Sequence, residues 1–569
     1  MSLLEITNQS ADPQCPCYLI HYHNRIYALD CGWDIQYLAP VLPDPTWLSN
    51  LPYLSSYDTN DLKHDIVNVN GQLFVNQPPF IVSYSLSHVD WGTVDAIFVS
   101  SMGSYLVLPI ILRDTGFCGS IYVPSSLHAM GYPLCLSMAA LAPSLSPPSL
   151  LASLLHHIPR YQHSEFTAYP MFTRDDVNRL QSSVTTVSFG EEIHRDHTVC
   201  ITCIHSGHDL ASCGWTFQSA CSHQQSFDLV YLPSDQLPLT QVTQSCPIDL
   251  VTRTKCLLIG RSNRSTEGDI HGLDGLKLFM QQCRNEDHPL LLLCDVNTLL
   301  LDILDNVLNG VIGHGKSCSM GFLDDAEGHR RRVLDAYKTH PECLSEPIQH
   351  SIFAGMPPFL CFDPNQSDLQ FTTLSSRLRQ FHLVIDPDLS LRFLFPSSFL
   401  TLPETPQIVV VDDRVDLSFL KPFLPDTAGI HQVRFPDSSE GFLRPFRDAN
   451  VRILRFSDVK SGEKATVPVE KGDLVEVAIK AESSRKRSSD WLKEGLFFVK
   501  AAKGREIEVK GRGVAFAKGE TADRRVDEMV RKLEEGGVSC EKEGNAVAVN
   551  GGKIKLEVEE STVILERSE

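Results

Sequence analysis

The sequence predicts an α/β protein with three parts, and three observations lead to this prediction. Residues 15–235 contain short strands rich in Ile, Val and Tyr, bounded by Gly, Pro, Asn or Ser, with helical segments between them. From about residue 250, fully apolar strands alternate with helices, which is typical of a parallel sheet covered on both faces. Near residue 456 the composition changes to Lys, Arg, Glu, Gly and Val, which indicates a separate C-terminal domain.

The first part contains strands that end in turns, followed by a second strand-rich block. Between the early strands, the spacing of apolar residues favours helices over 106–114 and 130–141. Proline and serine residues at 143–149 are typical of a loop. The expected strands lie at 17–23, 25–30, 94–99 and 119–124, and the second block runs over 184–232.

The second part alternates apolar strands with helices. Strands are expected at 255–260 and 289–294, and helices at 273–284 and 297–309. Residues 310–380 have weak periodicity, and the pattern assigns no elements to them. Regular structure resumes with strands beginning at Phe381 and Gln407.

The third part alternates cleanly between apolar and polar residues, as half-buried strands do. Asn550-Gly-Gly between two such strands is a hairpin signal. The pattern predicts a small α+β domain whose apolar positions are candidates for binding a partner. The strand pairs begin at Ile507 and Val514; the candidate positions are Val526, Met529, Val530 and Leu533 on one helix face, and Val547, Val549, Ile554, Leu556 and Val558 on strands.

Composition limits the classes of function. The chain has 569 residues, 42% of them hydrophobic, and a formal charge of -20. Because such a surface repels polyanions, a free-standing RNA-binding protein is disfavoured. Seventeen cysteines without a secretory start predict reduced thiols in the cytosol or nucleus. No apolar run approaches the length of a membrane span, so we expect a soluble protein.

The most informative segment is 95–109, Asp-Ala-Ile-Phe-Val-Ser-Ser-Met-Gly-Ser-Tyr-Leu-Val-Leu-Pro. It has the frame of the zinc loop of the metallo-β-lactamase superfamily, in which active enzymes carry His-x-His-x-Asp-His to hold two zinc ions. Counting back from Leu108-Pro109 places these four ligand positions at Val99, Ser101, Gly103 and Ser104. None of these side chains is a usual zinc ligand, so we expect no hydrolytic zinc centre and no cofactor.

Three further residues stand where active members of the superfamily have functional groups. Asp30, which ends a strand before a glycine turn, occupies the place of an acid that orients the zinc loop, or it caps N–H groups of a turn. His208 and Asp235 follow strands at the places of later metal ligands. Without the first loop they would hold zinc weakly, so they are weak metal candidates or ordinary polar loop residues.

Other polar clusters have ordinary interpretations. Cys200 and Cys203 form Cys-x-x-Cys, but a strand directs them to opposite faces, which favours packing, as for Cys15 and Cys17. The serines at 100, 101 and 104 lack a nucleophile elbow. The basic clusters at 329–332 and 485–487 are short enough to be solvated surface, although phosphate contacts or nuclear import are alternatives.

Taken in order, several motifs resemble one family. They are Leu29-Asp-Cys-Gly-Trp-Asp, Leu48-Ser-Asn-Leu-Pro, Thr93 to Ser100 with Leu108-Pro, Thr115 to Tyr122, Ser206-Gly-His, Leu389 to Phe393, and Ile408 to Asp412. The chain resembles the inactive metallo-β-lactamase/β-CASP subunits that accompany the RNA endonuclease of the Integrator complex. In an active β-CASP part the first strand ends in an acid, whereas Ile259-Gly-Arg-Ser-Asn contains none.

The resemblance implies a metallo-β-lactamase αββα sandwich (1–250 and 381–455), an inserted β-CASP α/β domain (251–380) and a C-terminal dimerisation region (456–569). It also implies a nuclear pseudo-nuclease that forms a heterodimer with the catalytic Integrator endonuclease. Small nuclear RNA 3′-end processing and transcript cleavage are the implied tasks. A helical-repeat scaffold subunit of the same cleavage module is an implied partner, RNA is contacted indirectly, and no membrane is involved.

Two competing hypotheses remain at this point. The chain could be the inactive large subunit of the pre-mRNA polyadenylation cleavage factor, which has the same fold. It could instead be a divergent metal-dependent hydrolase that recruits His88, His205, His208 and Asp235 as ligands. The identity of the catalytic paralogue that the chain binds distinguishes the polyadenylation-factor hypothesis from the family interpretation. The metal content of the purified chain distinguishes the hydrolase hypothesis from both.

Overall fold

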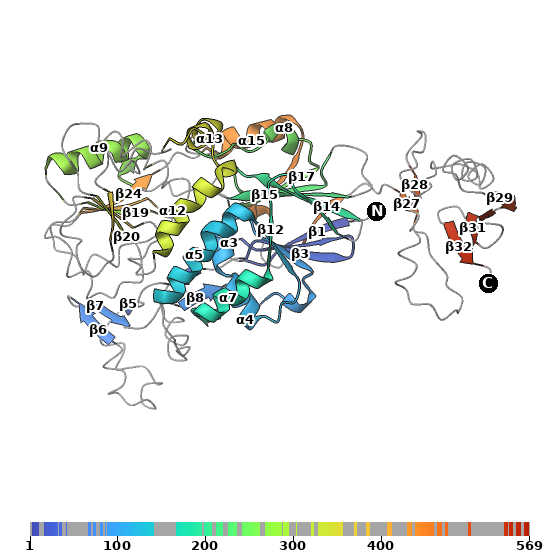
Figure 1. Ribbon diagram of the computed structural model, residues 1–569, viewed down its shortest axis with the longest axis horizontal. Coiled ribbons are helices and arrows are strands. Elements are labelled where there is room, and N and C mark those ends of the chain that lie inside the picture. Colours follow the sequence, from blue (N-terminus) through green and yellow to red (C-terminus); the bar gives the residue numbers. More distant parts are fainter. Residues whose placement is uncertain are drawn as a thin grey trace, which may run out of the picture. The chain divides into compact units, whose positions relative to one another are not determined.

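The computed structural model shows two sheets packed face to face, with helices outside each of them (Figure 1). The residues that it describes are 3–10, 16–31, 34–36, 41–42, 66–69, 72–75, 80–83, 86, 88–141, 167–195, 198–207, 212–219, 226–235, 242–261, 268–286, 288, 290–294, 303, 320–323, 328–356, 369–372, 383–386, 407–411, 429–434, 438–459, 464–468, 473–475, 499–501, 540–543, 546–549, 554–558 and 563–567.

The first sheet carries the loop that follows residue 98. Its order is β12 (Val184–Val187), β10 (Ser120–Pro124), β9 (Ala96–Phe98), β3 (Arg25–Leu29), β2 (Tyr18–Tyr22), β1 (Leu3–Asn8) and β26 (Lys464–Pro468). β3, β9, β10 and β12 are parallel neighbours, so their carboxyl ends share one edge. The strands predicted from residues 17, 25, 94 and 119 are confirmed.

Four helices pack on the outer face of the first sheet. They are α3 (Met102–Leu106), α4 (Leu108–Asp114), α5 (Ser125–Leu141) and α7 (Arg174–Ser183). Aliphatic side chains of α4 and α5, such as Ile110 and Leu127, are buried with Ile97 and Ile121 of the sheet. The helices predicted over 106–114 and 130–141 are present.

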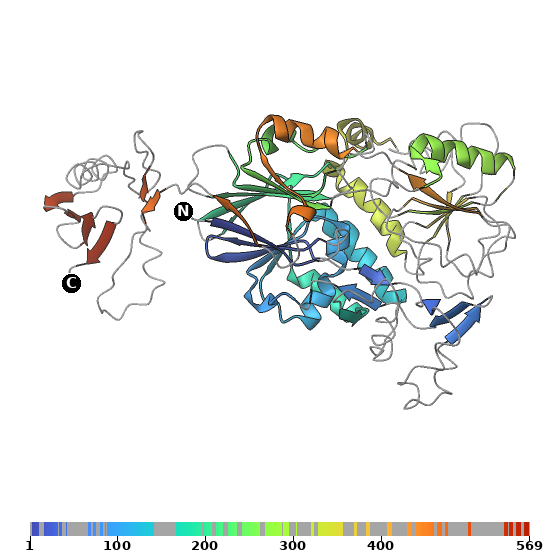
Figure 2. The same ribbon diagram turned by 180° about the vertical axis from the view of Figure 1, so that it is seen from behind.

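The second sheet has the order β13 (Glu192–Arg195), β14 (Val199–His205), β15 (Cys213–Ser219), β16 (Leu229–Ser234), β17 (Cys256–Arg261) and β25 (Arg452–Leu454). Its outer face is covered by α8 (Ile248–Val251) and α15 (Ser439–Asp448). Phe442, Leu443 and Phe446 of α15 pack on Val230 and Leu257. Seen from behind, the orange α15 lies over the green strands, which completes an αββα arrangement (Figure 2).

The inserted sheet is parallel throughout, as the alternation of apolar strands and helices predicts. Its order is β18 (Ile270–His271), β24 (Gly429–Arg434), β23 (Gln407–Val410), β19 (Leu290–Leu293), β22 (Leu383–Asp386), β20 (Met320–Leu323) and β21 (Leu369–Thr372). The helix predicted over 273–284 is α9 (Gly272–Asn285). The helix predicted over 297–309 lies outside the described residues, apart from position 303.

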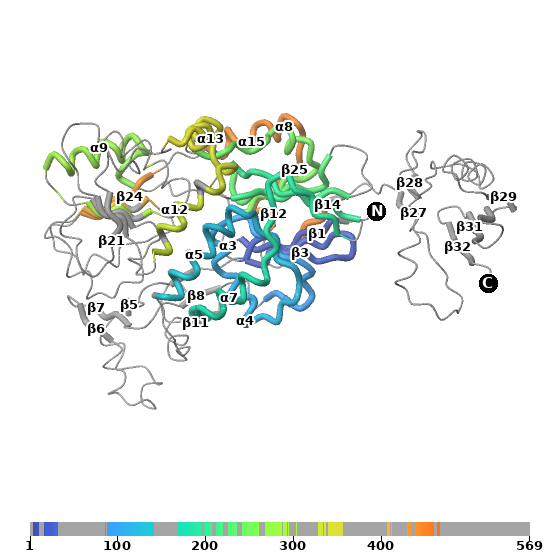
Figure 3. The backbone as a smooth tube through the Cα atoms, viewed as in Figure 1, coloured from blue at the N-terminus to red at the C-terminus, as the bar shows by residue number. Residues whose placement is uncertain are grey.

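Residues 310–380, to which the sequence pattern assigned nothing, contain further elements. Besides β20 and β21 they include α12 (His329–Thr339), η4 (Pro341–Cys343) and α13 (Glu346–Phe353). α12 packs beside α5 of the sandwich, as the tube in Figure 3 shows. The basic cluster at 329–332 begins α12, where Arg331 and Arg332 are exposed and His329 is buried.

Strand pairing places four strands differently from the sequence-based division. β17, assigned to the insertion, pairs in parallel with β16 of the sandwich. β22, β23 and β24, assigned to the sandwich, belong to the inserted sheet, where β22 and β23 pair with β19 and β24 pairs with β23. β17, β22 and β23 are short, apolar and parallel, so their sequences do not indicate which sheet they join. We propose that the insertion runs from about β18 to β24 and that β25 returns the chain to the sandwich.

Smaller sheets and turns complete the described structure. One sheet has the order β11 (Thr167–Pro170), β8 (Phe80–Ser83) and β4 (Asp34–Gln36), and another has β5 (Val41–Leu42), β7 (Gln72–Val75) and β6 (Ile66–Val69). Two short 3-10 helices are η2 (Trp91–Thr93) and η9 (Phe456–Asp458). No helix in the described part of the chain combines the length and apolar character needed to cross a bilayer.

The chain divides into two compact units. Leu4–Gln218 and Ser226–Val467 form one, and Met1–Leu3, Ser219–Gln225 and Pro468–Glu569 form the other. The C-terminal unit holds β27 (Asp473–Val475) paired with β28 (Val499–Ala501), and an antiparallel sheet of β29 (Cys540–Glu543), β30 (Ala546–Val549), β31 (Ile554–Val558) and β32 (Val563–Arg567). The predicted hairpin is present, because Val549 pairs with Ile554. The strands predicted from Ile507 and Val514, the helix positions Val526, Met529, Val530 and Leu533, and the basic cluster at 485–487 lie outside the described residues.

Candidate functional site

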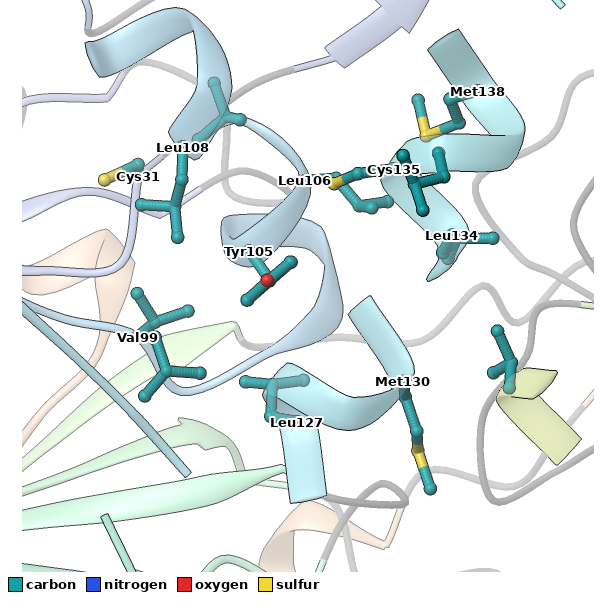
Figure 4. Packing of buried hydrophobic residues seen from close by; sticks show 14 of the residues in the cluster. Cys31, Val99, Tyr105, Leu106, Leu108, Leu127, Met130, Leu134, Cys135 and Met138 are labelled. Carbon is teal, nitrogen blue, oxygen red and sulfur yellow. The ribbon is translucent and has the colours of Figure 1, made fainter. Parts of the chain in front are cut away.

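The loop after β9 is built around a buried valine. Val99, at the first predicted ligand position, is fully buried, and Figure 4 shows it near Leu127 and Tyr105. Its backbone oxygen accepts a hydrogen bond from Nε1 of Trp215, 3.3 Å away in the second sheet. Because an aliphatic branch has no lone pair to donate, this position packs the core and cannot hold a metal.

The other three predicted ligand positions lie at the start of a helix. Ser101 is the N-cap of α3, and its hydroxyl oxygen accepts from the backbone N of Ser104 at 3.5 Å. The Ser104 hydroxyl in turn accepts from Ser101 Oγ and from the backbone N of Cys31, each 3.3 Å away. Gly103 lies in the first turn of α3. The two hydroxyls therefore satisfy backbone donors, which is the usual task of a serine at a helix start.

Asp30 ties this loop to both sheets. It follows β3 with φ of +55°, a conformation that Asp tolerates better than most residues. Its carboxylate is fully buried and accepts hydrogen bonds from the backbone N of Ser100 at 2.8 Å, from the Ser100 hydroxyl, and from Tyr231 Oη at 2.6 Å. Burial raises the pKa of Asp30, and the hydrogen bonds from Ser100 and Tyr231 oppose that rise.

The hydrogen bonds of Asp30 go to the loop after β9 and to β16. They are the contacts expected of a residue that orients this loop, which was the first of the two interpretations of the sequence. Tyr231, which the sequence analysis did not single out, comes from β16; a Cβ at Gly260 would overlap its hydroxyl. In the sequence, Tyr231 could have been found as the single hydroxyl-bearing side chain in the otherwise aliphatic run Leu-Val-Tyr-Leu.

Asp235 follows β16 and is fully buried. Its Oδ2 lies 3.8 Å from Nε of Arg455, the residue directly after β25. Since β16, β17 and β25 are parallel neighbours, both residues stand at the same edge of the second sheet. A guanidinium group from the chain itself thus supplies positive charge beside the carboxylate that would bridge metals in an active enzyme. Arg455 was not predicted; its signal was a cation immediately after a buried strand.

The alternative ligand set of the hydrolase hypothesis does not converge in the described residues. His208 lies outside them, and His88 is exposed. His205 ends β14 with its ring stacked on Phe189 at a centroid distance of 3.8 Å. The described residues contain one group of possible metal ligands whose donor atoms lie close together. His88, His205 and Asp235 do not belong to that group.

The environment of His205 predicts a pH dependence of stability. Burial lowers its pKa to about 4, although the carboxylate of Glu342 opposes this shift. An unfolded histidine titrates near pH 6.5. Between pH 4 and pH 6.5 the unfolded chain therefore binds more protons than the folded chain. The free energy of unfolding is highest above pH 6.5 and falls by up to about 3 kcal/mol as the pH decreases towards 4.

Urea unfolding at pH 7 and pH 5 would measure this loss. Replacing His205 with glutamine should reduce the difference in unfolding free energy between the two pH values. The matched control is His88→Gln, because an exposed histidine should leave the difference unchanged. Equal pH dependence in wild type and His205→Gln would contradict the assignment.

The comparisons with known proteins point to one group of relatives. No protein-family model matches the chain. Integrator complex subunit 9 of Xenopus laevis is 27% identical over 263 residues, which are 41% of this chain and 40% of the relative. The Homo sapiens protein of that name is 28% identical over the same shares, and the Nematostella vectensis homologue is 24% identical over 266 residues. The match thus spans about two fifths of the length of these relatives.

Solved structures are similar only at a low level. A protein of unknown function from Enterococcus faecalis V583 is 10% identical with a TM-score of 0.36, covering 81% of this chain and 96% of that one. A B3 metallo-β-lactamase with an active-site glutamic acid is 14% identical with a TM-score of 0.19, covering 43% and 72%. The strand pairing and helix layers described above, rather than these scores, define the fold. The chain has a metallo-β-lactamase-type αββα fold, and its relatives include proteins named Integrator complex subunit 9.

Proposed function

We propose that the chain is a non-catalytic subunit of an Integrator-type RNA-cleavage module. The observation that carries this proposal is the loop after β9, where an aliphatic side chain, two serines and a glycine stand at the four ligand positions. Ser101 caps the helix, the Ser104 hydroxyl accepts a hydrogen bond from the backbone N of Cys31, and Arg455 lies beside Asp235. The names of the relatives support the assignment to this complex.

The proposed task is to hold and support the catalytic metallo-β-lactamase/β-CASP endonuclease of the same module in the nucleus. In this arrangement the paralogue cleaves small nuclear RNA precursors and nascent transcripts, and this chain meets RNA indirectly. A helical-repeat subunit of the module is the second proposed partner. The net charge of -20 supports a role that does not depend on this chain binding RNA by itself.

The C-terminal sheet is the proposed binding surface for the nuclease. Register pairs Val547 with Leu556, and Leu556 with Leu565. Val549 pairs with Ile554, and Val558 pairs with Val563, so these apolar positions share one side of the sheet. The other side carries Ala548, Lys555 and Glu566. Lys542 and Arg567, on the two outer strands, lie on the same side as the apolar positions. An antiparallel sheet whose central strands are apolar on one side is suited to pairing with a similar domain.

Co-expression tests the proposed partner. The full chain should co-purify with the Integrator endonuclease and not with the polyadenylation endonuclease. Removing residues 468–569 should abolish co-purification, and Val547→Asp with Leu556→Asp should weaken it strongly. Ala548→Asp, on the opposite side of the same sheet, is the matched control and should leave binding intact. Capture of the polyadenylation paralogue instead would assign the chain to that factor.

A second measurement tests the absence of catalysis. The purified chain should not cleave RNA in the presence of zinc or manganese. A Cys200→Ser variant, which lacks the thiol considered below, should hold no pair of metal ions by elemental analysis. Two stoichiometric metals in that variant, together with RNA cleavage, would establish a hydrolase and overturn the proposal.

A further inference from the structure

A different group of metal-ligating side chains lies on the edge hairpin of the second sheet. β13 is the edge strand, and it pairs antiparallel with β14. His194 is directly opposite Cys200 across this pair, and Glu192 stands two residues before His194. Residues two apart on a strand point to the same side, so all three side chains lie on one face.

The three donor atoms are close enough to share one ion. The ligand atoms of Glu192, His194 and Cys200 all lie within 4.8 Å of one another. Nε2 of His194 is 3.4 Å from Oε2 of Glu192. Both side chains are more than half exposed, at 58% and 61%, so each can move by a rotamer change to close the remaining distance.

The cysteine is available as a ligand. Cys200 is a free thiol and is partly buried, whereas Cys203 is fully buried in the face towards the core. This separation agrees with the sequence prediction that the Cys-x-x-Cys residues lie on opposite faces. The packing interpretation therefore fits Cys203 but leaves the thiol of Cys200 beside a carboxylate and an imidazole.

We propose that Glu192, His194 and Cys200 form a binding site for a single Zn²⁺ ion, separate from the superfamily's zinc loop. A thiolate, an imidazole and a carboxylate are the three side-chain ligand types of zinc, whereas a thiolate disfavours Mg²⁺ and Ca²⁺. Three protein ligands leave the fourth tetrahedral position to water, which reaches this exposed strand. The thiol proton passes to solvent as the zinc–sulfur bond forms.

Binding of Co²⁺ to the reduced, metal-stripped full chain tests the site. Cobalt replaces zinc and gives a strong near-ultraviolet absorption only when a thiolate is a ligand. We expect the band to grow with one equivalent of Co²⁺ and to disappear when Zn²⁺ is added. Cys200→Ser should remove the band. His194→Ala should lower the affinity for Co²⁺ by more than about tenfold, because even the loss of a residue that only hydrogen-bonds to a ligand lowers metal affinity by that factor.

The matched control is Cys118→Ser, which removes an exposed thiol outside the cluster and should leave the band unchanged. Circular dichroism of each variant establishes that it folds. If Cys200→Ser does not fold, His194→Ala still tests the site, because it changes an exposed side chain and should not affect folding. A wild-type chain without the band, or a band that survives in Cys200→Ser, overturns the proposal. None of these readouts depends on RNA cleavage or on the nuclease partner, so they are independent of the proposed function.

Discussion

Replacing Phe98 with alanine is expected to lower the free energy of unfolding by about 4 kcal/mol, the largest effect that we predict for a single substitution. Phe98 ends β9 and is fully buried between the two sheets. Its ring stacks on Tyr122 at a centroid distance of 5.1 Å and meets the edge of Trp215 at 5.0 Å. Alanine would remove these contacts and leave a cavity that the two sheets cannot close without moving.

Denaturant unfolding of the full chain, followed by near-ultraviolet circular dichroism, measures this effect. Phe353→Ala is the matched control, because that ring is 72% exposed at the end of α13 and should contribute less than about 0.5 kcal/mol. Equal losses for the two variants would show that the aromatic contacts between the sheets do not hold the sandwich together.

Much of the fold could be predicted because its signals are local. Strands such as β3 and β9 combine β-branched and aromatic residues with a turn at each end, and β19 is a continuous apolar run. The sheet that each parallel strand joins is not a local property. β17 and β22 have similar apolar sequences, yet one pairs with β16 and the other with β19. Pattern alone therefore found β17, β22 and β23 but assigned them to the wrong sheet.

The candidate site also has features that the local sequence predicts and features that only the fold reveals. The prediction that Val99, Ser101, Gly103 and Ser104 stand at ligand positions without being ligands can be made from the sequence, because it depends on residue types within one loop. The groups that contact Asp30 and Asp235 come from far along the chain. Tyr231 reaches Asp30 across 201 positions, and Arg455 reaches Asp235 from beyond the whole insertion. Only the folded sandwich brings these pairs together.

The pair of Asp235 and Arg455 leads to the second large effect. Arg455→Met keeps the length and the apolar stem of the side chain but removes its positive charge. Asp235 is fully buried, and Arg455 is 28% exposed. Removing one partner of a buried ion pair leaves a desolvated charge, so we expect a loss of about 3 kcal/mol in the free energy of unfolding.

A double-mutant cycle separates charge from packing. Asp235→Asn should recover most of the loss caused by Arg455→Met, because the buried carboxylate is then gone. Lys464→Met is the matched control: Lys464 is exposed and pairs with Glu5 at 2.9 Å, away from Arg455 and Asp235, and its loss should cost at most about 1 kcal/mol. If Arg455→Met costs no more than Lys464→Met, other groups balance Asp235. If the predicted coupling is found, the guanidinium of Arg455 balances the buried carboxylate of Asp235, at the position where active members of the superfamily have a metal-bridging aspartate, and this result would support the proposed non-catalytic role.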